Sequence, residues 1–373
     1  MTPTQDHRRT PRLPVTVVVG TRPEVLKMAP VLRAMRARGA FDIDLCAVAQ
    51  HGALLDQALR DADLTPTARL SLGDGALALG DGLAATVSAV SARLRVCAGR
   101  ALLVQGDTTS ALGGALAGFY AGVPVAHVEA GLRSGDPAAP FPEEMHRALV
   151  DRLSAVLYAP SDQARENLLR EGFAPSRVVQ VGNTAIDAVR ALGAEGFAPS
   201  RAGSPRVLVT CHRRESFGDG VREVCDAVRS LVEAHPTVEV DYVLHPHPGA
   251  HEPPEARLRE VARVRLHAPM PHADFLDLLR RAAVVLTDSG GVQEEAAFLG
   301  RPLLVLRSGT ERVEAVQRGV ARIVGTHPAT VVPAVLAALR DDVAPAMPFL
   351  DYGDGDAGRR IAEDLHRRLE HGW

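Results

Sequence analysis

The 373-residue sequence is poor in aromatic residues and in lysine, and it has no long apolar run. Aromatic residues make up only 4% of it, so the cores must be filled mainly by Ala, Val and Leu. The apolar stretches are broken by Gly and Asp, and none approaches the roughly 18 residues that a membrane-spanning helix needs. The single lysine is Lys27, the net charge is −3, and no long basic stripe occurs. Neither a membrane nor a nucleic acid is therefore expected as a partner.

Cysteine is also scarce. Cys46, Cys97, Cys211 and Cys225 are far apart and form no Cys-x-x-Cys pair, which favours free thiols in a reducing compartment. Residues 1–14 contain arginines and prolines without a following apolar run, so they do not form a signal peptide. We therefore expect a cytoplasmic protein.

Short β-branched runs alternate with amphipathic stretches along the chain. Such alternation predicts parallel sheets covered by helices, and thus an α/β protein. The expected strands are residues 15–19, 43–48, 101–105, 123–127, 156–159 and 178–181, and then 207–210, 238–244, 284–287, 303–306 and 321–324.

A segment rich in Gly, Ala, Ser and Pro separates the two groups of strands and predicts an interdomain linker. The length suits two domains of about 150 to 200 residues each. Ligands of doubly wound sheets bind beyond the carboxyl ends of the strands, so we expect two Rossmann-like domains facing each other across a cleft. The expected parts are a tail (1–13), an N-terminal domain (14–192), a linker (193–205), a C-terminal domain (206–355) and a final helix (356–373) that packs back on the first domain.

Polar residues follow the first predicted strand. In Gly20-Thr21-Arg22-Pro23-Glu24, with Lys27 one turn later, a phosphate would find a helix N-terminus and cations. A capped turn with a solvated arginine explains this segment equally well. No Gly-x-Gly-x-x-Gly follows this strand, which argues against a dinucleotide, and no cofactor is expected.

Three acids are expected at the same sheet edge. Asp107 follows the strand at 101–105, Glu129 follows the next strand, and Glu143 opens a helix that contains Arg147. Asp107 could simply cap a helix, and a first-turn glutamate could merely complement the helix dipole. Their convergence is harder to explain in this way, because clustered carboxylates can supply an acid and a base together.

The second predicted domain offers groups for a diphosphate. His212 and Arg213 follow the strand at 207–210, and a histidine between a strand end and two arginines suits a diphosphate better than a core position.

The segment 287–295 is the sharpest local signal. After Ser289, two glycines, Gly290 and Gly291, permit close backbone approach to a ligand where a helix begins. Glu295 could bind ribose hydroxyls or be a solvated helix residue.

His245, His247 and His251 raise the question of a metal. The prolines between them preclude a regular ligand spacing, so no metal is expected, and His245 is retained as a nucleotide-binding candidate. A serine hydrolase is not indicated, because no Gly-x-Ser-x-Gly occurs.

The chain strongly resembles the bacterial UDP-N-acetylglucosamine 2-epimerases. Matching segments run in the family's order from near residue 15 to near residue 360. They are Gly20-Thr21-Arg22-Pro23-Glu24, Gln50-His51, Gly106-Asp107-Thr108-Thr109, His127-Val128-Glu129-Ala130-Gly131-Leu132-Arg133, Pro142-Glu143-Glu144, Gly182-Asn183-Thr184, His212-Arg213-Arg214-Glu215-Ser216, Asp288-Ser289-Gly290-Gly291-Val292-Gln293-Glu294-Glu295, Thr310-Glu311-Arg312 and Tyr352-Gly353-Asp354-Gly355.

The resemblance implies a GT-B-like pair of Rossmann domains, a homodimer, and a reaction without metal or nicotinamide. UDP would be eliminated to give a 2-acetamidoglucal and then added back, with the proton returned to the opposite face of carbon 2. By resemblance, the acid/base carboxylates are Asp107, Glu129 and Glu143, His212 serves the diphosphate, and the UDP-binding positions are Arg22, Ser289, Gly290, Gly291 and Glu295.

Departures from the family leave alternatives open. His146 stands where the family usually has Asn, and Ala53 and Ala76 stand where regulated members hold a second UDP-sugar with Gln and Arg. The last two predict hyperbolic kinetics. The alternatives are a hydrolysing relative that releases N-acetylmannosamine and UDP, an epimerase of a related nucleotide sugar, a retaining glycosyltransferase, and a non-catalytic UDP-sugar sensor.

Overall fold

A computed structural model describes residues 12–49, 53–72, 77–97, 99–191, 193, 204–211, 219–244, 254–340 and 349–373. The chain divides into two compact units, one of residues 1–184 with 356–373 and the other of residues 185–355. Both are built on parallel sheets, so the predicted α/β fold class is confirmed. None of the helices in these ranges combines the length and apolarity needed to cross a membrane.

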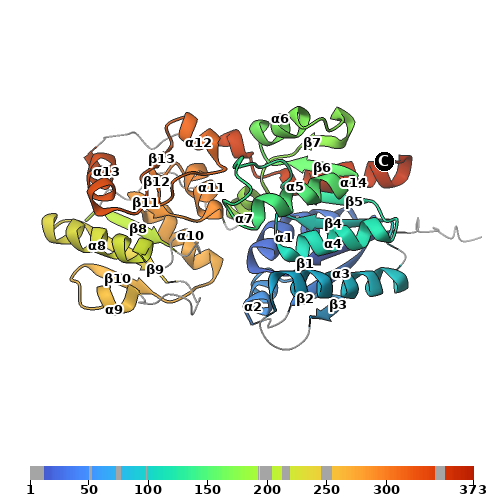
Figure 1. The fold of residues 1–373 in the computed structure, drawn as a ribbon, viewed down its shortest axis with the longest axis horizontal. Helices are drawn as coiled ribbons and strands as arrows, with labels where there is room; N and C mark the ends of the chain where they lie inside the picture. Colours follow the sequence, from blue (N-terminus) through green and yellow to red (C-terminus); the bar gives the residue numbers. More distant parts are fainter. Residues whose placement is uncertain are drawn as a thin grey trace, which may run out of the picture. The chain divides into compact units, whose positions relative to one another are not determined.

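The first unit contains a seven-stranded sheet in the order β3-β2-β1-β4-β5-β6-β7 (Figure 1). The order reverses between β1 and β4, the kind of position at which doubly wound sheets bind ligands. Its elements are β1 (Leu13–Val19), α1 (Arg22–Arg38), β2 (Phe41–Ala49), α2 (Ala53–Asp61), β3 (Ala68–Ser71), α3 (Leu79–Val96), β4 (Ala101–Gln105), α4 (Thr109–Tyr120), β5 (Val125–Val128), α5 (Glu143–Leu153), β6 (Val156–Ala159), α6 (Asp162–Arg170), β7 (Val178–Gln180) and α14 (Ala357–His371).

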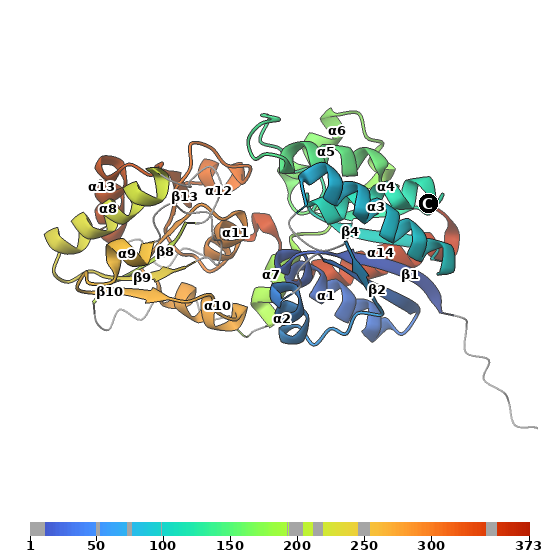
Figure 2. The same ribbon diagram turned by 60° about the horizontal axis from the view of Figure 1, so that its bottom comes forward.

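The central strands of this sheet are buried on both faces, which explains their continuous apolar runs. Along β1, Val17 and Val19 pack in a core with α1, while Val18 packs on the opposite face in a core with α3 and α4. Figure 2 shows α3, α4 and α5 above the sheet and α1 below it. The final helix α14 joins the α1 core through Ile361 and Leu365.

The second unit contains a six-stranded sheet in the order β10-β9-β8-β11-β12-β13. Its two faces carry separate cores, one with α8 and α13 and the other with α7, α10 and α11. Its elements are α7 (Thr184–Ala191), β8 (Arg206–Thr210), α8 (Asp219–Ala234), β9 (Glu239–Val243), α9 (Pro254–Leu258), β10 (Val264–His267), α10 (His272–Arg281), β11 (Val284–Thr287), α11 (Gly290–Phe298), β12 (Leu303–Val305), α12 (Val313–Gln317), β13 (Ala321–Ile323) and α13 (Pro328–Arg340).

The division between the units lies after Thr184, earlier than the expected end of the first domain at residue 192. The reason is packing, because Ile186 and Val189 of α7 lie in a core of the second unit. Most of the expected linker 193–205 lies outside the described residues.

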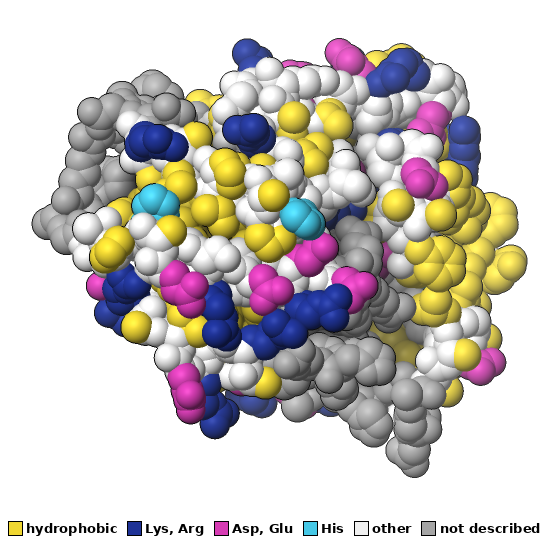
Figure 3. Space-filling model, turned by 60° about the vertical axis from the view of Figure 1, so that its left-hand side comes forward, with side chains coloured by type: hydrophobic (Ala, Val, Ile, Leu, Met, Phe, Trp, Pro, Cys, Tyr) yellow, Lys and Arg dark blue, Asp and Glu magenta, His cyan; other side chains and the backbone are white. Residues whose placement is uncertain are grey.

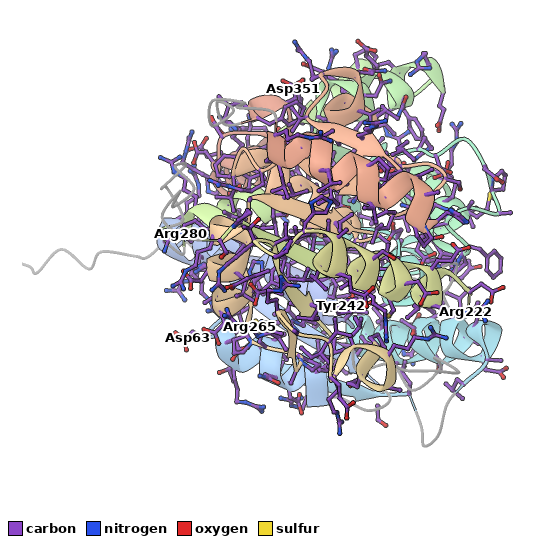
Figure 4. All side chains as sticks on the ribbon, turned by 90° about the vertical axis from the view of Figure 1, so that its left-hand side faces the viewer. Asp63, Arg222, Tyr242, Arg265, Arg280 and Asp351 are labelled. Atoms are coloured by element: carbon purple, nitrogen blue, oxygen red, sulfur yellow. The ribbon has the colours of Figure 1, made fainter. Side chains whose placement is uncertain are left out.

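Two strands, β3 and β10, were absent from the sequence prediction. Both are at sheet edges, where the exposure of successive residues is mixed and polar side chains interrupt the apolar pattern. Figure 4 labels Arg265 on β10 and the fully buried Tyr242 on the neighbouring β9. An edge strand that carries such exposed residues cannot be recognised by continuous hydrophobicity.

Charged side chains of both signs are interspersed on the face of the molecule in Figure 3. The described side chains on this face form no uniform basic surface of the kind that binds nucleic acids.

Candidate functional site

Two of the predicted acids, Asp107 and Glu129, follow neighbouring strands of the first sheet. Strands β4 and β5 are paired in parallel, with Gln105 opposite Val128. Asp107 and Glu129 follow these strand ends, so both lie at the carboxyl edge of the sheet. The convergence expected from the sequence is therefore present for this pair.

Arg147 of α5 joins these two acids. Its Nη2 hydrogen-bonds Asp107 Oδ2 and lies 3.5 Å from Glu129 Oε1, while its Nη1 donates to the backbone oxygen of Glu129 at 2.6 Å. The side chains of Arg147 and Glu129 are each 4% exposed, whereas that of Asp107 is 25% exposed. The acids are thus held together by a shared cation, and Asp107 remains the more accessible of the two.

Glu129 also contacts a second cation. Lys27 Nζ lies 2.5 Å from Glu129 Oε2, and the amide of Gln105 donates to the same oxygen at 2.6 Å. Burying a carboxylate is costly unless it is paired and hydrogen-bonded, and Glu129 meets both conditions. Lys27, expected to bind a phosphate, is here a partner of a buried acid.

The backbone at Glu129 adopts a conformation that non-glycine residues rarely adopt, with φ of 71°. Such residues cost about 1–3 kcal/mol and persist where the surroundings fix them, often at functional sites. The surroundings here are a hydrogen bond from Glu129 N to Tyr158 O at 3.1 Å and the bond from Arg147 to Glu129 O.

A buried network lies beneath both loops. His127 Nδ1 lies 2.7 Å from Asp151 Oδ1, and His127 Nε2 lies 2.8 Å from the carbonyl oxygen of Gly106, the residue before Asp107. Arg133 donates to the other Asp151 oxygen at 2.7 Å. Burial alone would raise the pKa of Asp151, but His127 and Arg133 outweigh it and hold that pKa below its usual value. Sequence reasoning gave His127 and Asp151 no role, and both are fully buried in the structure.

The two glutamates that open α5 differ in environment. Glu144 is buried and accepts hydrogen bonds from the backbone N–H groups of Ser134 at 2.9 Å and Gly135 at 3.0 Å. Glu143 is half-buried, and its carboxylate forms no hydrogen bond or ion pair with any residue in the described ranges. Because Glu143 precedes Arg147 by four positions, both project from the same side of the helix.

His146 of α5 also contacts Asp107. Its Nδ1 lies 3.0 Å from the backbone oxygen of Asp107. Asp107 does not cap the helix that follows it, because the N-cap is Thr108, whose hydroxyl accepts from Ala111 N. The structural explanation considered for Asp107 is therefore wrong.

The turn after β1 is hydrogen-bonded to the residues that follow Asp107. Thr21 caps α1, and Arg22 is its half-buried first residue. Glu24 is buried and accepts from Thr108 Oγ1 at 2.8 Å and from Ser110 Oγ at 3.0 Å. Burial raises the pKa of Glu24, against the opposing effect of these hydrogen bonds.

In the second unit, α11 begins directly after β11. Ser289 is its N-cap residue and makes no side-chain capping bond, so the first N–H groups of the helix lack a side-chain acceptor from this residue. A Cβ on Gly291 would have no atom within 4 Å among the described residues. The start of this helix is therefore open on the Gly291 side.

Gly290 also has a structural reason to lack a side chain. A Cβ at this position would lie 2.6 Å from Arg312 Cζ, so the missing side chain makes room for a guanidinium of the same unit. Arg312 donates to Glu294 Oε1 at 2.9 Å and also pairs with Glu311. Sequence reasoning gave Arg312 no role, although it stands in the matching segment Thr310-Glu311-Arg312.

Glu295 is not a solvated helix residue. Its side chain is 10% exposed, and its Oε1 lies 2.7 Å from Nε2 of His272, at the start of α10.

The remaining candidates, His212, Arg213 and His245, lie outside the described residues, as do Gln50 and Ala76. Within the described ranges, no group of three or more His, Cys, Asp or Glu could hold a metal ion.

Comparison with known proteins agrees with this arrangement. The family model described as UDP-N-acetylglucosamine 2-epimerase matches residues 33–366. A Yersinia pestis protein named UDP-N-acetylglucosamine 2-epimerase is 39% identical, over 94% of this chain and 98% of its own length.

Solved structures agree over the same extent. The Neisseria meningitidis UDP-GlcNAc 2-epimerase bound to UDP-GlcNAc has a TM-score of 0.88 and 32% identity, covering 95% of this chain and 100% of that one. The Methanocaldococcus jannaschii enzyme in complex with UDP-GlcNAc and UDP has a TM-score of 0.82 and 30% identity, covering 95% and 100%. Two parallel-sheet units, acids at the edge of one sheet and an open helix start in the other accompany a match over nearly the whole chain, and the chain therefore belongs to the UDP-N-acetylglucosamine 2-epimerase family.

Proposed function

We propose that this protein interconverts UDP-N-acetylglucosamine and UDP-N-acetylmannosamine. A base removes the proton from carbon 2, the bond between carbon 1 and the diphosphate oxygen breaks, and UDP leaves a 2-acetamidoglucal. UDP then adds back to carbon 1 while an acid delivers a proton to the opposite face of carbon 2. The observation that carries this proposal is the pair Asp107 and Glu129, joined by Arg147 at one sheet edge.

The environments of the three acids suggest different tasks. Proton transfer requires a carboxyl group that the sugar can reach, which favours the partly exposed Asp107 and the half-buried Glu143. Glu129 is enclosed by Lys27 and Arg147, so it suits the role of fixing these cations and their neighbours, with proton transfer as the alternative.

The second unit would hold UDP. An open helix start at Ser289 and Gly291 favours the diphosphate, because helix N–H groups and the helix dipole attract anions. Glu295 would accept hydrogen bonds from ribose. Arg22, His212, Arg213 and His245 remain candidates for the diphosphate on the basis of the sequence.

One experiment tests the reaction directly. In deuterated water, a proton NMR time course with UDP-N-acetylglucosamine should show UDP-N-acetylmannosamine with deuterium at carbon 2. Retention of the original hydrogen would exclude proton exchange with solvent. Free N-acetylmannosamine and UDP would identify the hydrolysing alternative, turnover that depends on an added acceptor would identify a transferase, and binding without turnover would identify a sensor.

We also propose a homodimer. Large apolar side chains are exposed on the helices that cover one face of the first sheet, among them Val96, Phe119 and Tyr120, with exposures of 75%, 60% and 71%. Light scattering coupled to gel filtration tests this, and Phe119→Ser with Tyr120→Ser should shift the mass towards the monomer. A cytoplasmic location is part of the same proposal, supported by the four cysteines, which are free thiols.

A further inference from the structure

His272 and Glu295 come from different helices and meet at the start of α10. His272 Nε2 lies 2.7 Å from Glu295 Oε1. Their side chains are 11% and 10% exposed, so the contact is largely shielded from water but not sealed.

The chemistry of the two groups fixes the direction of the hydrogen bond. An ionised carboxylate only accepts, so the hydrogen lies on Nε2 of His272 whether the ring is neutral or charged. No other residue in the described ranges hydrogen-bonds the carboxylate of Glu295. The second oxygen, Oε2, and one lone pair of Oε1 therefore remain for another donor.

The position of Glu295 indicates what that donor is. Gly291 and Glu295 are four residues apart on α11, so they share one face of the helix. That face has open space at Gly291. A nucleotide whose diphosphate binds at this helix start carries its ribose directly after the diphosphate. The hydroxyls of the ribose are donors, and a carboxylate with free lone pairs is their natural acceptor.

We propose that His272 is a positioning residue that orients Glu295 so that its carboxylate recognises the 2′ and 3′ hydroxyls of a ribonucleoside diphosphate. This inference rests on the proposed function. A glutamate side chain loses rotamer freedom when it binds a ligand, and a hydrogen bond that already fixes it reduces that loss. Selection of ribonucleotides over deoxyribonucleotides thus depends on a residue that does not touch the nucleotide.

The test compares two ligands, UDP and 2′-deoxy-UDP, by calorimetric titration of the full chain. The protein should bind UDP about tenfold or more tightly than 2′-deoxy-UDP, since a hydrogen bond to a charged group is lost. His272→Ala should weaken UDP binding and reduce this preference to about threefold or less. His272→Gln retains an N–H donor and should restore part of the preference. Asp274→Ala, an exposed change in the same helix, is the matched control and should preserve it.

The role of Glu295 is tested in the same assay. In a Glu295→Ala background, adding His272→Ala should have no further effect on the preference. An equal fall of both affinities in His272→Ala would show a merely structural role and overturn the inference, as would an unchanged preference. If the unmodified protein epimerises its substrate but binds both ligands equally, only this inference fails. If it neither binds UDP nor turns over UDP-N-acetylglucosamine, the proposed function fails.

Discussion

Lys27, the single lysine of the chain, forms an ion pair with Glu129, with 2.5 Å between Nζ and Oε2. The pair joins α1 to the residue that follows β5, two elements that are far apart in the sequence. In the structure Lys27 therefore holds Glu129, whereas its place after the first strand predicted phosphate binding.

Lys27→Met should lower turnover by about 100-fold while leaving UDP affinity unchanged. The physical reason is the loss of a cation beside a buried carboxylate, which lets Glu129 and its neighbours shift from their productive geometry. Steady-state kinetics and UDP titration measure the two quantities. Lys27→Arg keeps the charge and should recover part of the activity. A fall in UDP affinity that matches the fall in turnover would instead support the phosphate-binding role.

The fold, and the meeting of Asp107 and Glu129 at one sheet edge, followed from the sequence because they depend on local patterns. Alternating apolar runs predicted the central strands, and strand ends predicted where polar residues gather. The partners of those residues did not follow. That Arg147 bridges two acids, or that His127 supports the carbonyl of Gly106, depends on α5 and β5 meeting at particular positions. Periodicity specifies which face of an element is buried, but not which two side chains touch across elements.

Glu143→Gln should affect turnover and Glu144→Gln should affect stability, although the two residues are adjacent. Glu143→Gln should reduce turnover by about 100- to 10,000-fold without changing thermal stability, because it removes a proton-transfer group that has no described partner. Glu144→Gln should destabilise the protein, because the charge-assisted bonds to Ser134 N and Gly135 N contribute about 1.5–3 kcal/mol each. Kinetics and thermal unfolding of both variants test this. Near-normal turnover of Glu143→Gln would remove it from the catalytic set.

The buried network at Asp151 predicts how stability depends on pH. After burial, which opposes ionisation, His127 and Arg133 are the contacts that hold the pKa of Asp151 below its usual value. A carboxyl with a lowered folded-state pKa contributes stability above its unfolded pKa, and this contribution is lost as the pH falls through the folded value. Asp151→Asn should therefore cost about 3–5 kcal/mol at pH 7, and the difference from the unmodified protein should shrink in acid.

Urea unfolding at pH 7 and at pH 2 measures this difference, because the contribution is lost only below the usual pKa of an aspartate. Glu166→Gln, a change at an exposed position of α6, is the control and should alter stability little at either pH. If the effect of Asp151→Asn were the same at both pH values, the charge of Asp151 would not be the source of the stabilisation.

Substitution by alanine should change the melting temperature at Gly290 but not at Gly291. At Gly290 a Cβ would lie 2.6 Å from Arg312 Cζ. Arg312 cannot easily move aside, because Glu294 and Glu311 hold its guanidinium. Gly290→Ala should therefore lower the melting temperature. Gly291 has open space at its Cβ position, so Gly291→Ala should leave the melting temperature unchanged.

The same pair of variants locates the diphosphate. A methyl group at Gly291 would stand at the open start of α11, where the diphosphate is proposed to bind, and should weaken UDP binding by about tenfold through loss of close approach. Thermal unfolding and UDP titration of the two variants give the comparison, since both changes add the same methyl group one residue apart. Unaltered UDP affinity in Gly291→Ala would place the diphosphate elsewhere in the protein. An unaltered melting temperature in Gly290→Ala would mean that the Arg312 side chain can move away from the added methyl group despite its two buried carboxylate partners.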